Sequence, residues 1–168
     1  QDPFQIVRFH EELKAQNPLM RSTLAMLNIA LYDLIARRAR LPLHQLLGGY
    51  RKKIQTSITI GIEPLDETLR LAEDYWQQGF RILKLKGGLN VEEDIEKVFR
   101  LREKLGRELT LRFDANQGYN IAQSVQFVEQ TKAAKIEILE QPTPYGEDEA
   151  MRKVVNSVEV PVMADESI

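Results

Sequence analysis

The spacing of apolar residues divides the 168-residue chain into a helical first part and a second part in which strands and helices alternate. Residues 2–14 begin with an Asp-Pro pair, which is typical of a helix cap followed by proline at the first helical position. Asn17-Pro18 repeats this signal before a second expected helix at 19–38. That helix is apolar on most faces, which predicts a largely buried helix: Leu24, Met26, Leu27, Ile29, Leu31, Leu34 and Ile35.

From residue 54 onward, short apolar runs alternate with segments of helical periodicity. Strands are expected at 54–62, 80–86, 109–114, 135–140 and 160–165. Helices are expected between them, at 66–78, 91–104, 121–133 and 147–157. This alternation is typical of parallel strands that are joined by right-handed helical crossovers.

Three acidic residues each close one of these strand-like runs. Asp114, Glu140 and Asp165 follow one another at intervals of 26 and 25 residues, so each repeats its position within a strand–helix unit. In a parallel barrel such positions meet at one rim, where three carboxylates are costly unless a cation neutralises them. A site made only of oxygen ligands favours a hard divalent ion such as Mg²⁺.

A pair of lysines precedes the acids. Lys84 and Lys86 lie on one face of the expected strand 80–86, because side chains repeat every two residues. Alone, such a pair is usually a solvated strand end, and a single acid after a strand is usually a helix cap. The three acids in phase with the lysine pair favour a common site.

Two further sequence features have both a functional and a structural interpretation. Asn116 either faces the site or belongs to the turn that Asn-Gln-Gly predicts. Gly87-Gly88 either binds phosphate or forms a left-handed turn into the next helix, and the turn is the preferred interpretation.

The fold class follows from where these residues lie. An open doubly wound sheet is the alternative, but no glycine-rich dinucleotide motif follows the first strand. The candidate residues come from the ends of four strands, as they do at a barrel rim. Because a complete (β/α)₈ TIM-type barrel needs about 250 residues, five strands predict an incomplete barrel whose first and fifth strands have unpaired edges.

Composition narrows the class of protein. Hydrophobic residues make up 43% and charged residues 29%, as in a folded α/β protein. The formal charge of −2 gives no reason to expect a nucleic-acid partner, and the apolar stretch 22–32 is too short to span a membrane. We expect a cytoplasmic protein.

The absence of cysteine from the sequence excludes thiolate nucleophiles and Cys-ligated zinc. A start at glutamine and an end just after the third acid indicate a piece of a longer protein.

The motifs together resemble the mandelate racemase and muconate lactonizing branch of the enolase superfamily. The resemblance covers nearly the whole chain: NIALYDLIARR and LPLHQLLGG, then KLK, FDANQGY, LEQP and ADES. It implies that 1–50 is a helical linker or remnant of a capping domain and that 54–168 is the N-terminal part of the barrel, with strands one to five. It also implies the site residues: Mg²⁺ ligands Asp114, Glu140 and Asp165, general base Lys86, and Lys84 as its cationic neighbour.

The resemblance further implies an activity, the Mg²⁺-dependent removal of the proton alpha to a carboxylate. QTSITIGI is similar to a stretch of dipeptide epimerases, which adds Thr56 to Asn116 as a further candidate and favours a dipeptide or related acid as substrate. A muconate-type cycloisomerase and a succinylbenzoate synthase remain alternatives, because they use the same metal site and lysines. A non-catalytic, self-associating half-barrel is a third. A homo-oligomer is expected.

Epimerases of this family use a second lysine on the sixth strand, opposite the first. The five strands expected here do not include it. We therefore expect that the full-length parent is the enzyme and that the 168-residue chain alone does not epimerise a substrate.

Overall fold

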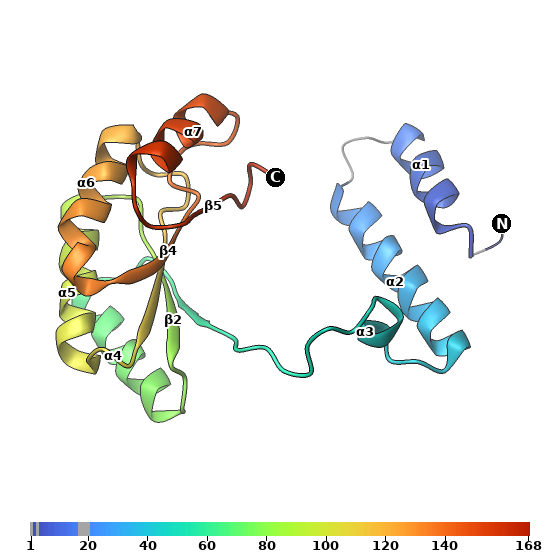
Figure 1. Ribbon diagram of the computed structural model, residues 1–168, viewed down its shortest axis with the longest axis horizontal. Helices are drawn as coiled ribbons and strands as arrows, with labels where there is room; N and C mark the ends of the chain where they lie inside the picture. Colours follow the sequence, from blue (N-terminus) through green and yellow to red (C-terminus); the bar gives the residue numbers. More distant parts are fainter. Residues whose placement is uncertain (1, 3, 17–20) are drawn as a thin grey trace. The chain divides into compact units, whose positions relative to one another are not determined.

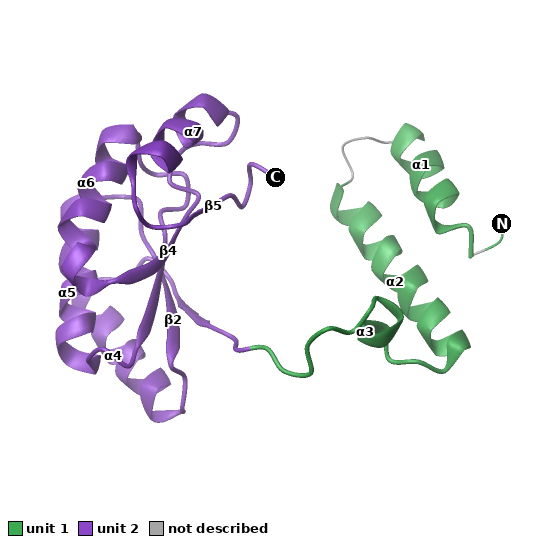
Figure 2. Ribbon diagram, in the orientation of Figure 1, with its two compact units in different colours: residues 1–54 green, residues 55–168 purple. Residues whose placement is uncertain are grey.

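The computed structural model describes residue 2, residues 4–16 and residues 21–168. The chain forms two compact units, Gln1–Ile54 and Gln55–Ile168, which Figure 2 shows in green and purple. The helix signal expected at Asn17-Pro18 lies outside the described residues.

The first unit is helical, as predicted. It contains α1 (Ile6–Gln16), α2 (Arg21–Ala39) and the short α3 (Leu43–Leu46). The expectation of a largely buried second helix is wrong for this structure. Leu24 and Ala36 are the buried residues of α2, and other apolar residues on it are exposed: Met26 60%, Ile29 64% and Leu34 44%. Within the described part of its unit, α2 packs against α1 and α3, and this packing leaves those apolar side chains exposed.

The second unit alternates strands and helices, which confirms the predicted pattern. In chain order, its elements are β1 (Ile58–Ile60), α4 (Leu65–Gln77), β2 (Ile82–Lys86), α5 (Val91–Leu105), β3 (Thr110–Asp114), α6 (Ile121–Thr131), the 3₁₀ turn η1 (Lys132–Ala134), β4 (Ile136–Glu140), α7 (Asp148–Ser157) and β5 (Val162–Met163). The first and fifth strands are much shorter than the expected runs 54–62 and 160–165. Each lies at an edge of the sheet, with one neighbouring strand among the described residues.

The five strands are all parallel and lie side by side in chain order. A doubly wound sheet reverses its strand order, so this topology excludes that alternative and is the order of a barrel wall. Figure 1 shows α4, α5 and α6 along one side of the strands. No helix in the described part of the chain is long and apolar enough to cross a membrane.

The hydrophobic core lies between the strands and these helices. Alternate residues of β2 and β3 are buried in it, among them Leu83, Leu85, Leu111 and Phe113. The Phe113 ring lies 4.1 Å from the ring of Phe127 on α6. Because successive side chains of a strand point to opposite faces, the intervening charged residues of β2 and β3 are placed on the other face of the sheet.

Candidate active site

The charged residues at the ends of β2, β3 and β4 are neighbours in the sheet. The strands pair Lys86 with Asp114 and Asp114 with Glu140. Each of these residues is the last of its strand, so parallel pairing in chain order brings them to one rim.

Lys84 bridges the two carboxylates. Its Nζ lies 2.6 Å from Oε1 of Glu140 and 3.0 Å from Oδ2 of Asp114. Both acids are buried, with 1% of Asp114 and 6% of Glu140 exposed. Lys86 lies on the same face, with its Nζ 3.4 Å from Oδ2 of Asp114. The structure therefore joins two of the three predicted acids with both predicted lysines.

The environment keeps Lys84 positively charged. Burial by itself lowers the pKa of Lys84, but the hydrogen bond to Glu140 and the attraction of the Asp114 and Glu140 charges outweigh it, and the pKa is raised. The ammonium thus supplies the positive charge that two buried carboxylates require.

The donor set fits a hard divalent cation. Oδ2 of Asp114 is buried and accepts no hydrogen bond from the described residues, although it lies in ion-pair range of both lysines. It is therefore a carboxylate oxygen that only positive charge compensates. With the neighbouring Glu140 carboxylate it offers the oxygen ligands that such ions prefer.

The third acid is placed apart. Asp165 is exposed in the turn that follows β5. The pairing of β4 with β5 ends at Glu140 and Met163, so Asp165 lies two residues beyond the last paired position. In the described ranges, no three His, Cys, Asp or Glu side chains are close enough to hold one metal ion.

Of the two further candidates, Asn116 joins the site and Thr56 does not. Lys86 Nζ donates a hydrogen bond to Oδ1 of Asn116 at 2.9 Å, and the backbone N–H of Asn116 donates to Oδ1 of Asp114 at 2.8 Å. Asn116 also has a φ of 48°, so it both faces the site and forms the turn. Thr56 precedes β1 and lines a hollow with Phe80 and Arg81 at the N-terminal ends of the strands. It thus lies at the opposite ends of the strands from the lysines.

A buried hydrogen-bond network that sequence reasoning missed supports the loops that follow β2 and β3. Oδ2 of Asp94, on α5, accepts hydrogen bonds from the Gly88 N–H at 2.8 Å and from the Tyr119 hydroxyl at 2.7 Å. Asp94 is 2% exposed, and burial raises the pKa of its carboxyl. Gly88 has a φ of 101°, as the predicted left-handed turn requires. An acid in the first helical turn was visible in the sequence, but its partner 25 residues away was not.

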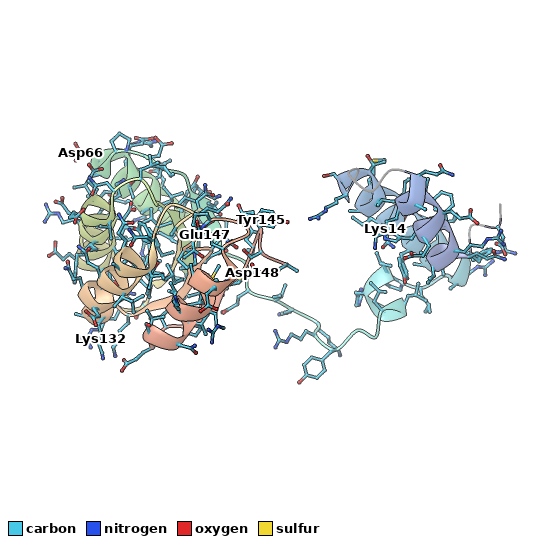
Figure 3. The ribbon with its side chains drawn as sticks, turned by 90° about the horizontal axis from the view of Figure 1, so that it is seen from above. Lys14, Asp66, Lys132, Tyr145, Glu147 and Asp148 are labelled. Atoms are coloured by element: carbon cyan, nitrogen blue, oxygen red, sulfur yellow. The ribbon has the colours of Figure 1, made fainter. Side chains whose placement is uncertain are left out.

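The β4–α7 loop is held in a similar way. Gln141, directly after Glu140, is fully buried and accepts a hydrogen bond from the Asp165 N–H through its side chain at 2.8 Å. Further along this loop, the Tyr145 N–H donates to Oε1 of Gln117 at 2.9 Å. Figure 3 shows Tyr145, Glu147 and Asp148 close together where the loop enters α7.

The family model and the curated relatives that match this chain agree with each other. Residues 67–168 match the family model described as enolase C-terminal domain-like. The chain is 43% identical over 159 residues to the L-Lys-D/L-Arg epimerase of Desulforapulum autotrophicum, and the aligned part covers 93% of this chain and 45% of that protein. It is 36% identical over 166 residues to the hydrophobic dipeptide epimerase of Enterococcus faecalis, covering 99% of this chain and 47% of that protein. The chain thus spans about half the length of these curated relatives.

Solved structures agree with the sequence relatives. The dipeptide epimerase of Enterococcus faecalis V583, complexed with Mg and L-Leu-L-Tyr, superposes with a TM-score of 0.95 at 36% identity and covers 99% of this chain and 47% of that one. The dipeptide epimerase of Cytophaga hutchinsonii, complexed with Mg and D-Ala-L-Val, gives 0.93 at 34% identity, covering 100% and 46%. The five parallel strands are therefore part of a TIM-type barrel. The chain belongs to the enolase C-terminal domain-like family, and its relatives include dipeptide epimerases.

Proposed function

We propose that this chain supplies the lysine base and the Mg²⁺ ligands of a dipeptide epimerase. The observation that carries the proposal is the contact of Lys84 with both buried carboxylates, Asp114 and Glu140, beside Lys86. The names of the relatives favour epimerisation over the cycloisomerase and succinylbenzoate synthase alternatives. The relatives that carry this activity in their names are about twice as long as this chain.

Asp114, Glu140 and Asp165 would hold the Mg²⁺ ion. When bound, the ion would stabilise the negative charge that grows on the substrate carboxylate as the alpha proton leaves. Asp114 supplies a buried oxygen without a hydrogen bond among the described residues, and Glu140 is its neighbour in the sheet. Asp165 would approach them from the turn after β5.

Lys86 would remove the alpha proton of the substrate. Its side chain is 35% exposed, so its Nζ is open to a bound molecule, and Asn116 orients it by accepting a hydrogen bond. A general base acts only within hydrogen-bond reach of the proton that it takes, which requires such an orientation. Lys84, more deeply placed between the carboxylates, would stay charged and help to bind a carboxylate oxygen.

One base on one side of the substrate does not complete an epimerisation. The proton must return on the opposite face, and Lys86 reaches one face only. We therefore propose that the 168-residue chain alone does not epimerise dipeptides. We also expect it to self-associate, because β1 and β5 are edge strands with main-chain groups open to pairing among the described residues.

The proposal is tested with a chimera in which this chain replaces the matching segment of the full-length Desulforapulum autotrophicum relative. We expect the chimera to epimerise dipeptides in the presence of Mg²⁺, measured by solvent deuterium incorporation at the alpha carbon. Lys86→Met should lower the rate about 100- to 10,000-fold, the usual contribution of a general base. The control is Lys153→Met on the exposed face of α7, which should leave the rate unchanged.

Two outcomes would contradict the proposal. One is a folded chimera that turns over dipeptides equally well without Lys86. The other is a chimera that binds Mg²⁺ but acts on no dipeptide. Inversion of a dipeptide by the 168-residue chain alone would refute the proposed inactivity of the isolated chain.

A further inference from the structure

Gln141 occupies an unusual position directly after the proposed ligand Glu140. It is fully buried, and its φ is 33°, a backbone conformation that residues other than glycine rarely adopt. Such a conformation persists where the surrounding contacts fix it. The contacts of Gln141 therefore indicate what this conformation serves.

The side-chain amide of Gln141 is bound at both ends. Its Oε1 accepts hydrogen bonds from the backbone N–H groups of Asp165 at 2.8 Å and Ser167 at 3.3 Å. Its Nε2 donates to the backbone carbonyl of Thr143 at 2.9 Å and to Oγ of Ser167 at 2.9 Å. Backbone groups have fixed donor and acceptor roles, so they determine which end of the amide points to which turn.

The backbone of Gln141 connects the same loops. Its N–H donates to the carbonyl of Met163 at 2.8 Å, and its carbonyl accepts from the N–H of Gln117 at 2.8 Å. One buried residue thus joins the loops that follow β3, β4 and β5. These loops follow Asp114, follow Glu140 and contain Asp165, respectively.

We propose that Gln141 is a positioning residue that anchors the turn of Asp165, so that this exposed carboxylate is available to a divalent cation held by Asp114 and Glu140. This inference rests on the proposed function. Glutamine suits the task because its oxygen accepts from two backbone N–H groups while its nitrogen donates to the neighbouring loop. A methionine of similar length would leave those groups without partners, and the turn that carries Asp165 would lose its attachment.

The test is a double-mutant cycle on Mg²⁺ binding by the 168-residue chain, measured by calorimetry. Gln141→Met, Asp165→Asn and the double variant are compared. We expect Gln141→Met to weaken Mg²⁺ binding about 10- to 100-fold, as the loss of partners that orient metal ligands does. If Gln141 acts through Asp165, the Asp165→Asn change will have little further effect in the Gln141→Met background.

Thr143→Val is the matched control. The Thr143 hydroxyl is buried and has no hydrogen-bond partner among the described residues. Valine has nearly the volume of threonine, so the change removes no hydrogen bond from the turn that carries Asp165. Mg²⁺ affinity should stay unchanged. Circular dichroism confirms that each variant is folded at the titration temperature. If Gln141→Met does not fold, Gln141→Asn, whose amide is one methylene shorter, takes its place in the cycle.

The outcomes separate this role from the proposed function. Unchanged affinity in Gln141→Met, or strictly additive effects of the two substitutions, would overturn the positioning role while the metal site stands. No saturable binding by the unchanged chain would refute the metal site, and with it this role of Gln141.

Discussion

Replacing Gly88 with alanine is expected to lower the free energy of unfolding of the second unit by about 4 kcal/mol or more, in the range of the most damaging single substitutions. A Cβ atom at this position would lie 1.9 Å from the carbonyl oxygen of Ala115 and 3.2 Å from Cα of Gly118. Both obstacles are backbone, so no change of side-chain rotamer relieves them. The φ of 101° adds strain for any residue with a side chain.

The loss is measured by urea denaturation followed by circular dichroism, with Gly79→Ala as the control. Gly79 has nearly the same φ, 95°, but no described atom lies within 4 Å of its added Cβ. Gly79→Ala should therefore cost only the backbone term of about 1–2 kcal/mol. Equal losses in the two variants would show that the close crossing at Gly88 contributes nothing beyond its backbone angle.

The crossing at Gly88 matters because it lies directly behind the proposed site. Gly88 is two residues after Lys86, and the segment that it crosses, Ala115 to Gly118, contains Asn116. The Asp94 carboxylate holds the same loops by accepting from Gly88 and Tyr119. Displacing them would move the lysine and the amide that orients it.

Replacing Lys84 with methionine is expected to destabilise the metal-free chain by about 3 kcal/mol at neutral pH, the usual cost of removing one partner of a buried ion pair. Asp114 and Glu140 would remain buried without the ammonium that contacts both. The pKa of Lys84 is raised in the folded chain, so its stabilising contribution is complete at neutral pH. That contribution disappears only as the pH rises through the raised pKa.

The same substitution is expected to strengthen Mg²⁺ binding. The ammonium of Lys84 occupies the oxygens that the ion would use, so its removal ends a competition and leaves two unpaired negative charges. Added Mg²⁺ should therefore restore more stability to Lys84→Met than to the unchanged chain. Urea denaturation with and without Mg²⁺ measures both effects.

Lys86→Met is the control for Lys84→Met. Its Nζ is farther from Asp114, at 3.4 Å, and its side chain is more exposed, so its loss should cost less than about 1 kcal/mol. Equal destabilisation by the two substitutions would contradict the central role of Lys84. So would a Lys84→Met chain that Mg²⁺ does not stabilise.

The parts of the site that could be predicted from sequence are those set by strand periodicity. Lys84 and Lys86 share a face because side chains alternate, and Asp114 and Glu140 meet because each ends a parallel strand. Asp165 ends its run in the same phase, but β5 is short and its pairing stops two residues earlier. The position of a residue at the end of a strand-like run predicts the rim of the sheet on which the residue lies. The distance of that residue from the other site residues depends on how far the strands pair.

The parts that could not be predicted depend on tertiary contacts. The apolar faces of α2 predict burial, but the neighbours that would cover them are not encoded in the helix itself. Asp94 and Tyr119 meet across 25 residues, and Gln141 reaches Asp165 across 24. The QTSITIGI motif makes Thr56 a candidate, but the motif does not say where the strand begins. Because β1 begins at Ile58, Thr56 lies at the N-terminal end of the strands, opposite the lysines.

Calorimetric titration of Mg²⁺ into the 168-residue chain tests the central claim most directly. Asp114→Asn and Glu140→Gln remove one negative charge each. The control is Glu137→Gln, which removes a carboxylate that lies on β4, the strand of Glu140, but pairs with Arg112. We predict saturable binding that is lost in the first two variants and kept in the third. Absence of binding, or binding that survives both ligand substitutions, would contradict the assignment of this strand-end cluster as the metal site.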